Sequence, residues 1–104
     1  MSLFGSLAEA VRNGWSIEFG TEALDGSNPT SVTTNVTIQG AMVCLNTKTT
    51  IADLTHLVSY FVETATPNQL DIYGWKTTSG SDPTMVAATD TEPVTWIVWG
   101  PIIA

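Results

Sequence analysis

Residues 94–99 read VTWIVW, and this stretch gives the clearest fold signal in the chain. Side chains alternate between the two faces of a β-strand, so a strand here would place Trp96 and Trp99 on opposite sides of a sheet. Valine, isoleucine, threonine and tryptophan all fit a pleated surface better than a helix. The stretch predicts a strand with one tryptophan in the core and the other directed outward or against a partner.

The same two-residue period recurs along the rest of the chain. Residues 24–29 (LDGSNP), 77–83 (TTSGSDP) and 90–93 (DTEP) have the composition of loops and turns. Residues 54–63 fit a strand or a helix, and their β-branched and aromatic content favours the strand. The further strands that we predict cover 15–20, 32–38, 41–45, 54–63, 70–75 and 85–88. About seven short strands separated by regular turns predict an all-β, antiparallel sandwich, jelly-roll-like in character.

A short helix is predicted before the first strand. Ser6 and Glu9 have the spacing of a capping box, in which each side chain satisfies a free backbone N–H of the other residue. Asn13 and Gly14 both tolerate the left-handed conformation that ends a helix. We therefore divide the chain into a helical arm, 1–13, and a single β-sandwich domain, 14–104. The arm could pack on its own sheet or dock on a neighbouring subunit, and the sequence leaves both open.

The charge balance limits the partners. The chain has 104 residues, a net charge of −7 and three cationic side chains. Binding to nucleic acid or to an anionic membrane needs many more cations, so we expect neither. With one cysteine, no disulfide can form within the chain, which favours folding in a reducing cytosol. We find no apolar run long enough for a bilayer span and no secretory signal.

The residues that catalysis needs are scarce. His56 is the single histidine, which leaves a histidine-based metal site or a catalytic triad without its parts. Cys44 stands in an apolar run, where we expect a buried and unreactive thiol. The acidic residues lie mostly in or beside predicted loops, where carboxylates are ordinarily solvated. We expect no catalytic residue, no metal and no cofactor.

Four tryptophans are many for a chain of this length. An exposed tryptophan is typical of a protein interface or of a surface that stacks on a sugar ring. One hypothesis is therefore a carbohydrate-binding module. Its stacking platform would be Tyr73 and Trp75, with Asp71 or Asp82 accepting hydrogen bonds from sugar hydroxyls.

Two stretches resemble small virion proteins of tailed phages. The first is FGTEALDGSNPTSVTTNV, residues 19–36; the second runs from LDIYGWK, residues 70–76, to VTWIVWG, residues 94–100. Together they cover about half of the chain. The resemblance implies a capsid decoration (cement) protein, located on the capsid surface, that reinforces the joints of the phage head. Such proteins commonly sit on the shell as trimers or dimers. Under the same resemblance, the alternative carbohydrate-binding module would be a host-recognition module of a phage tail fibre or spike.

Our leading hypothesis is therefore a non-enzymatic virion protein that binds the major capsid protein or other virion proteins. One small core has difficulty hiding so many aromatic side chains, so we also expect a homo-oligomer. The choice of a trimer rests on the resemblance alone. The contact residues that we predict are apolar and lie in the helical arm, the last strand and the C-terminal tail: Leu3, Phe4, Leu7, Val11, Trp99, Ile102 and Ile103.

Overall fold

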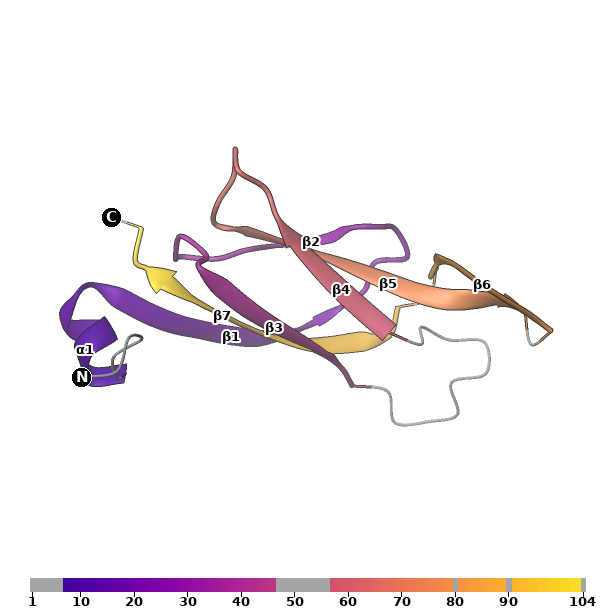
Figure 1. The fold of residues 1–104 in the computed structure, drawn as a ribbon, viewed down its shortest axis with the longest axis horizontal. Coiled ribbons are helices and arrows are strands. Elements are labelled where there is room, and N and C mark those ends of the chain that lie inside the picture. The colour runs from indigo at the N-terminus through magenta and orange to yellow at the C-terminus, as the bar shows by residue number, and fades with distance from the viewer. Residues whose placement is uncertain (1–6, 47–56, 80, 90, 104) are drawn as a thin grey trace.

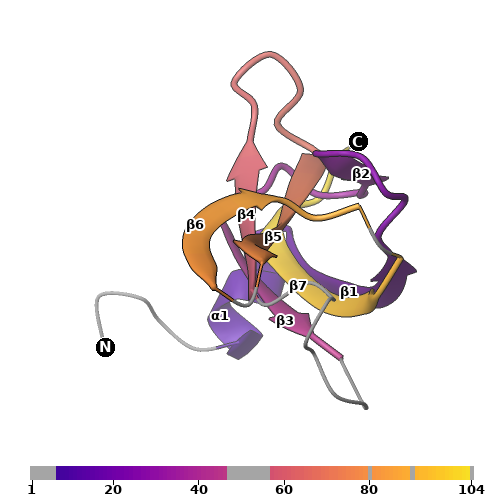
Figure 2. The same cartoon turned by 90° about the vertical axis from the view of Figure 1, so that its right-hand side faces the viewer.

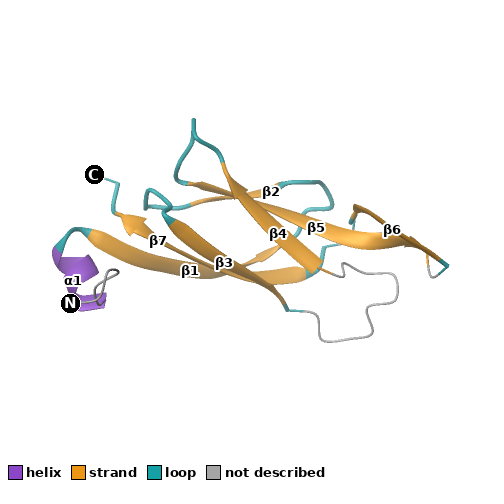
Figure 3. Cartoon of the chain, viewed as in Figure 1, coloured by secondary structure: helices purple, strands orange, loops and turns teal. Residues whose placement is uncertain are grey.

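The computed structural model describes residues 7–46, 57–79, 81–89 and 91–103. These residues form one short helix and seven strands, as Figure 3 shows. In chain order the elements are α1 (Leu7–Arg12), β1 (Trp15–Ala23), β2 (Thr30–Thr33), β3 (Gly40–Leu45), β4 (Leu57–Val62), β5 (Gln69–Ser79), β6 (Asp82–Ala87) and β7 (Pro93–Pro101). The predicted all-β class with seven strands is confirmed.

The strands form two antiparallel sheets. Sheet A has the order β1-β7-β3, and sheet B has the order β2-β5-β4, with β6 also pairing with β5. Viewed along the long axis, the two sheets form two layers (Figure 2). The architecture is therefore sandwich-like, as the alternating strands predict.

The core lies between the two sheets and draws on strands of both. Strand β7 contributes its even-numbered residues, and β5 contributes Leu70 and Ile72, which are fully buried. Trp96 is 8% exposed, and its ring lies close over Gly20 of β1, where an added Cβ would come within 2.9 Å of Trp96 Cζ2. The buried apolar core comprises Leu24, Val32, Val36, Ala41, Leu70, Ile72, Val94, Trp96 and Val98.

Strands β2 and β6 pair in succession along one edge of β5, and a side chain fills the gap between them. Strand β2 pairs with Gln69–Ile72, whereas β6 begins its pairing at Trp75. Between them, the Asn28 side-chain amide donates to the Gly74 carbonyl at 2.9 Å and accepts from the Gly74 N–H at 3.1 Å. Asn28 thus takes the place of a backbone partner and keeps the buried polar groups of Gly74 satisfied.

Residues 32–38 do not form one strand, so that prediction was wrong in extent. Strand β2 ends at Thr33, and the buried Thr34 donates its backbone N–H to the Asn68 carbonyl at 2.8 Å. Two residues later, Val36 forms an isolated bridge with Ile102, next to sheet A. The chain therefore crosses from one sheet to the other here, because Thr34 and Asn68 hold the bend.

Residues 77–83 were predicted to be a loop, and this was also wrong. Strand β5 runs to Ser79 and β6 begins at Asp82, so these residues belong to a hairpin that projects from the sandwich (Figure 1). Threonine favours strands, and this preference prevails over the loop-like glycine and proline. The projection makes the molecule long, with extents of 51 × 28 × 20 Å and a radius of gyration of 15.9 Å, against about 13 Å for a compact domain of this length.

The ambiguous segment 54–63 contains strand β4, so the favoured interpretation is confirmed over its described residues, from Leu57 onward. Helix α1 also lies within the predicted arm, of which residues 1–6 are outside the described part. The helix lies beyond the end of β1 (Figure 1), contacts mainly that strand and leaves Val11 57% exposed. Its described residues therefore leave the broad faces of both sheets uncovered.

Candidate binding surfaces

The outer side of sheet A is apolar and carries no charge. The register pairs Phe19 of β1 with Ile97 of β7, and Ile97 in turn with Met42 of β3, so these three side chains lie in one row on one face. Phe19 is 73% exposed and Met42 57% exposed. We call this surface face A; it consists of Trp15, Ile17, Phe19, Thr21, Ala23, Gly40, Met42, Cys44, Pro93, Thr95, Ile97, Trp99 and Pro101.

Face A shows which side of the first strand is turned outward. The alternation of Ile17 and Phe19 with polar residues predicts a half-buried strand and does not by itself say which set faces the core. The core side carries Glu18 and Gly20, because Trp96 needs the space above Gly20. Glu18 lies beside the bend after β2, where its carboxylate accepts the Asn35 backbone N–H at 2.8 Å.

Trp99 is a predicted contact residue, and the structure places it on face A. Its partly exposed ring covers Gly40 of the neighbouring strand so closely that a Cβ at Gly40 could not be accommodated. The expectation that Trp96 and Trp99 face opposite sides of the sheet is confirmed. Cys44 was expected to be buried, but it is exposed, because its strand turns that side outward.

The other predicted contact residues are not gathered with Trp99 into one described surface. Leu3 and Phe4 lie outside the described residues, and Leu7 is described only as the first residue of α1. Ile102 and Ile103 are 56% and 44% exposed. The backbone of the tail is nevertheless fixed, since Ile102 N–H donates to the Gly14 carbonyl at 2.8 Å and Ile103 N–H to the Asn35 carbonyl at 2.9 Å.

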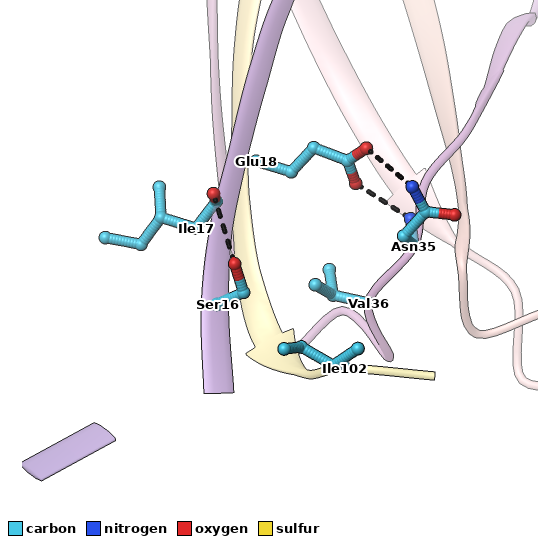
Figure 4. Close-up of a pocket in the computed structure, with 6 residues that line it drawn as sticks. All are labelled: Ser16, Ile17, Glu18, Asn35, Val36 and Ile102. Carbon is cyan, nitrogen blue, oxygen red and sulfur yellow. Dashed lines mark hydrogen bonds between the residues drawn. The ribbon is translucent and has the colours of Figure 1, made fainter. Parts of the chain in front are cut away.

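A hollow of about 250 Å³ lies beside this tail (Figure 4). Its lining is mixed: Ile17, Val36 and Ile102 are apolar, whereas Ser16, Glu18 and Asn35 are polar. The Glu18 carboxylate is already engaged by the backbone and side chain of Asn35, as the dashed lines in the figure show. The hollow is therefore an open gap at the sandwich edge, and its acid supports the bend of the chain.

The outer side of sheet B, which we call face B, mixes aromatic and polar groups. The rings of Tyr73 and Trp75 stack with their centroids 6.2 Å apart and their planes 12° from parallel. Trp75 Nε1 donates to Ser59 Oγ across the strand pair at 2.9 Å. Face B consists of Ser31, Thr33, Leu57, Ser59, Phe61, Gln69, Asp71, Tyr73 and Trp75, of which Leu57 and Phe61 are 49% and 54% exposed.

Asp71 and Asp82 do not complete a sugar site in the way that we expected. Asp71 is 2% exposed, and its carboxylate already accepts from Ser31 Oγ and Gln69 Nε2, each at 2.8 Å. Asp82 lies near the hairpin tip. It is five residues along β6 from Ala87, which pairs with Trp75, so the two positions on β6 are about 17 Å apart. A hydrogen bond from the Thr84 backbone N–H lowers the pKa of Asp82 below its ordinary value of 3.8. The stacked rings therefore lack both proposed acids as free acceptors.

Metal-binding side chains are not clustered in the described part of the chain. His56 lies outside it, and within it no cluster of three or more histidine, cysteine or acidic side chains could hold a metal ion. No helix among the described residues is long and apolar enough to cross a membrane. No protein-family model, curated protein or solved structure matches the chain.

Sequence reasoning missed Ile17, Phe19 and Met42 as surface residues. It predicted the alternation of β1, but alternation by itself does not say which set of side chains faces inward. The available signal was Gly20, a residue without a side chain placed among the polar set of β1. A glycine in a strand often marks the close approach of another group, here the ring of Trp96.

Proposed function

We propose that this protein is a non-enzymatic structural protein that acts through protein–protein contacts, and that it is a capsid decoration protein of a phage. The observation that carries the first part is face A. A contiguous apolar patch of several hundred Å², the size of the largest patch on a typical monomer, is often a binding surface. Face A spans three strands, has Phe19 and Met42 at its centre and lacks charged residues.

The placement on a virion rests on the resemblance of residues 19–36, 70–76 and 94–100 to small phage virion proteins. The fold supports this proposal by placing the second and third of these stretches in β5 and β7, the central strands of their sheets. These strands carry Trp99 to face A and Trp75 to face B. A shell of capsid proteins would offer the apolar docking sites that such faces require.

The test compares particles of a phage that encodes this chain with particles from which its coding sequence has been deleted. The proposal predicts that the chain co-purifies with wild-type particles in stoichiometric amounts. It also predicts that deleted particles release their DNA at a lower temperature, and that adding purified chain restores the resistance. Wild-type particles that lack the chain, or deleted particles with unchanged thermal resistance, would overturn the proposal.

A second candidate function is binding of a neutral carbohydrate on face B. It is favoured by the stacked rings of Tyr73 and Trp75 and by the hydroxyl of Ser59, which accepts a hydrogen bond from Trp75 Nε1 beside them. The net charge of −7 disfavours an anionic ligand such as a nucleic acid. Titration with neutral oligosaccharides should quench tryptophan fluorescence, and Trp75→Ala should abolish the response while Trp99→Ala keeps it. Equal responses from both variants would exclude this site.

A further inference from the structure

Face A differs from the rest of the molecule in its charge. The chain carries −7 overall, with ten acidic side chains against three cationic ones, so two copies repel each other wherever acids meet. On β1 the alternation puts Glu18 and Glu22 on the core side of the strand, away from face A. Face A is therefore a broad surface on which two copies can approach without placing carboxylates against one another.

The apolar residues of face A also suit a second copy. The row of Phe19, Ile97 and Met42 crosses all three strands, and Ile17 and Trp99 lie in the next row. Interface cores are depleted in charged residues and enriched in aromatic residues and methionine. Face B is a poorer surface for this purpose, since hydrogen bonds already tie its polar side chains to one another around Asp71.

The area of face A can be compared with the area that a stable dimer interface buries. Strands β1 and β7 have nine residues each, or about 30 Å of length, and β3 has six, or about 20 Å. With strands about 4.8 Å apart, the face covers on the order of 400 Å² in projection. Stable interfaces bury about 800 Å² per partner, so this area argues for a reversible dimer and against a permanent one.

Symmetry distinguishes a dimer from a trimer. When a flat surface packs on the same surface of another copy, the contact closes around a two-fold axis and leaves no part free for a third copy. A three-fold ring needs two different patches on each chain. The single broad face made by β1, β7 and β3 provides the first arrangement, with the two sheets stacked about 10 Å apart.

We propose that face A packs against face A of a second copy, giving a weak two-fold dimer. The inference deepens the proposed function, because it uses the same surface and names its first partner. In this arrangement Phe19 and Met42 are buried at the centre of the contact, and face B points outward from both sides of the dimer.

The test is sedimentation velocity over a range from low to several hundred micromolar, with a reductant present because Cys44 lies on face A. We expect the wild-type chain to shift from monomer to dimer as its concentration rises. Phe19→Asp and, independently, Met42→Asp should each weaken the dimer at least tenfold. Phe61→Asp is the matched control, because Phe61 is 54% exposed on face B, and this variant should dimerise like the wild type. Circular dichroism of each variant verifies the fold.

A wild-type chain that stays monomeric throughout the range would overturn the dimer, as would a trimer. Equal loss of association in Phe61→Asp would overturn the assignment to face A. These results are separable from the proposed function. A monomer that still joins particles removes the dimer and leaves the capsid role, whereas a dimer absent from particles removes the capsid role and leaves the dimer.

Discussion

Face A and face B are the outer surfaces of two sheets of similar size, yet they are built from different chemistry. Face A has no charged residue, and the hydrogen bond from Asn46 Nδ2 to Thr95 Oγ1 lies toward one end of it. Face B has Asp71 near its centre, held by Ser31 and Gln69. A surface whose polar groups are already satisfied is stable in water by itself, whereas an uncharged apolar surface gains free energy when it is covered. The difference points to face A as the surface for assembly.

Packing of Trp96 in the core and the hydrogen bond of Asn28 at the edge of sheet B both stabilise the fold, and mutation can measure them separately. On the core side of sheet A, Trp96 packs over Gly20. Trp96→Ala removes this ring and leaves a cavity, which should cost about 3–5 kcal/mol of unfolding free energy, the largest effect that we predict. Urea denaturation followed by circular dichroism measures it.

Trp99→Ala is the matched control for Trp96→Ala, since it deletes the same side chain from the opposite face of the same strand. Trp99 is partly exposed, so its loss should cost less than half as much. Equal costs for the two variants would contradict our assignment of Trp96 to the core and Trp99 to the outer surface.

Sheet B shares this apolar core and also has a side-chain hydrogen bond at the edge of β5. Asn28→Ala leaves the buried N–H of Gly74 without its acceptor, while the Gly74 carbonyl keeps the Ala88 N–H at 2.9 Å. An unsatisfied buried donor costs about 1–3 kcal/mol, and thermal unfolding of the variant should show a loss of this size.

Asn35→Ala provides the comparison for Asn28→Ala. The Asn35 side-chain amide is exposed and lies 3.5 Å from Glu18 Oε1, so its removal should change the stability by less than about 0.5 kcal/mol. A similar loss from both asparagines would show that Asn28 has no special role in the edge of β5.

The smallest predicted effect concerns the loop before β2. A hydrogen bond from the Ser27 hydroxyl, with others from Ser27 N–H and Thr30, holds the pKa of Asp25 below its ordinary value of 3.8. A lowered folded-state pKa stabilises the fold above the unfolded value, and this contribution is lost as the pH falls through the folded pKa. The stability difference between wild type and Asp25→Asn should therefore shrink as the pH drops below 3.8. A difference that stays constant with pH would contradict this.

The sequence predicted the strands better than it predicted what they face. Residues 94–99 were predicted to be a strand, and all of them lie within β7, whose side chains alternate between buried and partly buried. The turn composition of residues 24–29 correctly predicted the loop between β1 and β2. The same alternation in β1 did not show which side of the strand is buried. That side is decided by Trp96, which reaches Gly20 from the neighbouring strand β7. The hairpin of β5 and β6 was missed because a glycine and a proline give residues 77–83 the composition of a loop.

The residues of the candidate surfaces were also predicted in part: the sequence identified the aromatic side chains but not the environment of Asp71. Trp99, Tyr73 and Trp75 were singled out as aromatic side chains on strands, and the structure leaves all three partly exposed on the outer faces. Asp71 was misjudged, because its partner Ser31 is 40 residues away and meets it only through the pairing of β2 with β5, whereas Gln69 lies two residues before it on β5 itself. Long-range pairing of this kind cannot be derived from local composition.

The most direct test of the central claim, that face A is covered by assembly and face B is not, uses the single cysteine as a reporter. Cys44 lies exposed on face A, and Thr33→Cys in a Cys44→Ser background places an equivalent thiol on face B. The rate of maleimide labelling is measured at low and high protein concentration. Our account predicts that labelling of Cys44 slows several-fold at high concentration, while labelling at position 33 does not change. Unchanged labelling of Cys44, or equal slowing at both positions, would contradict it.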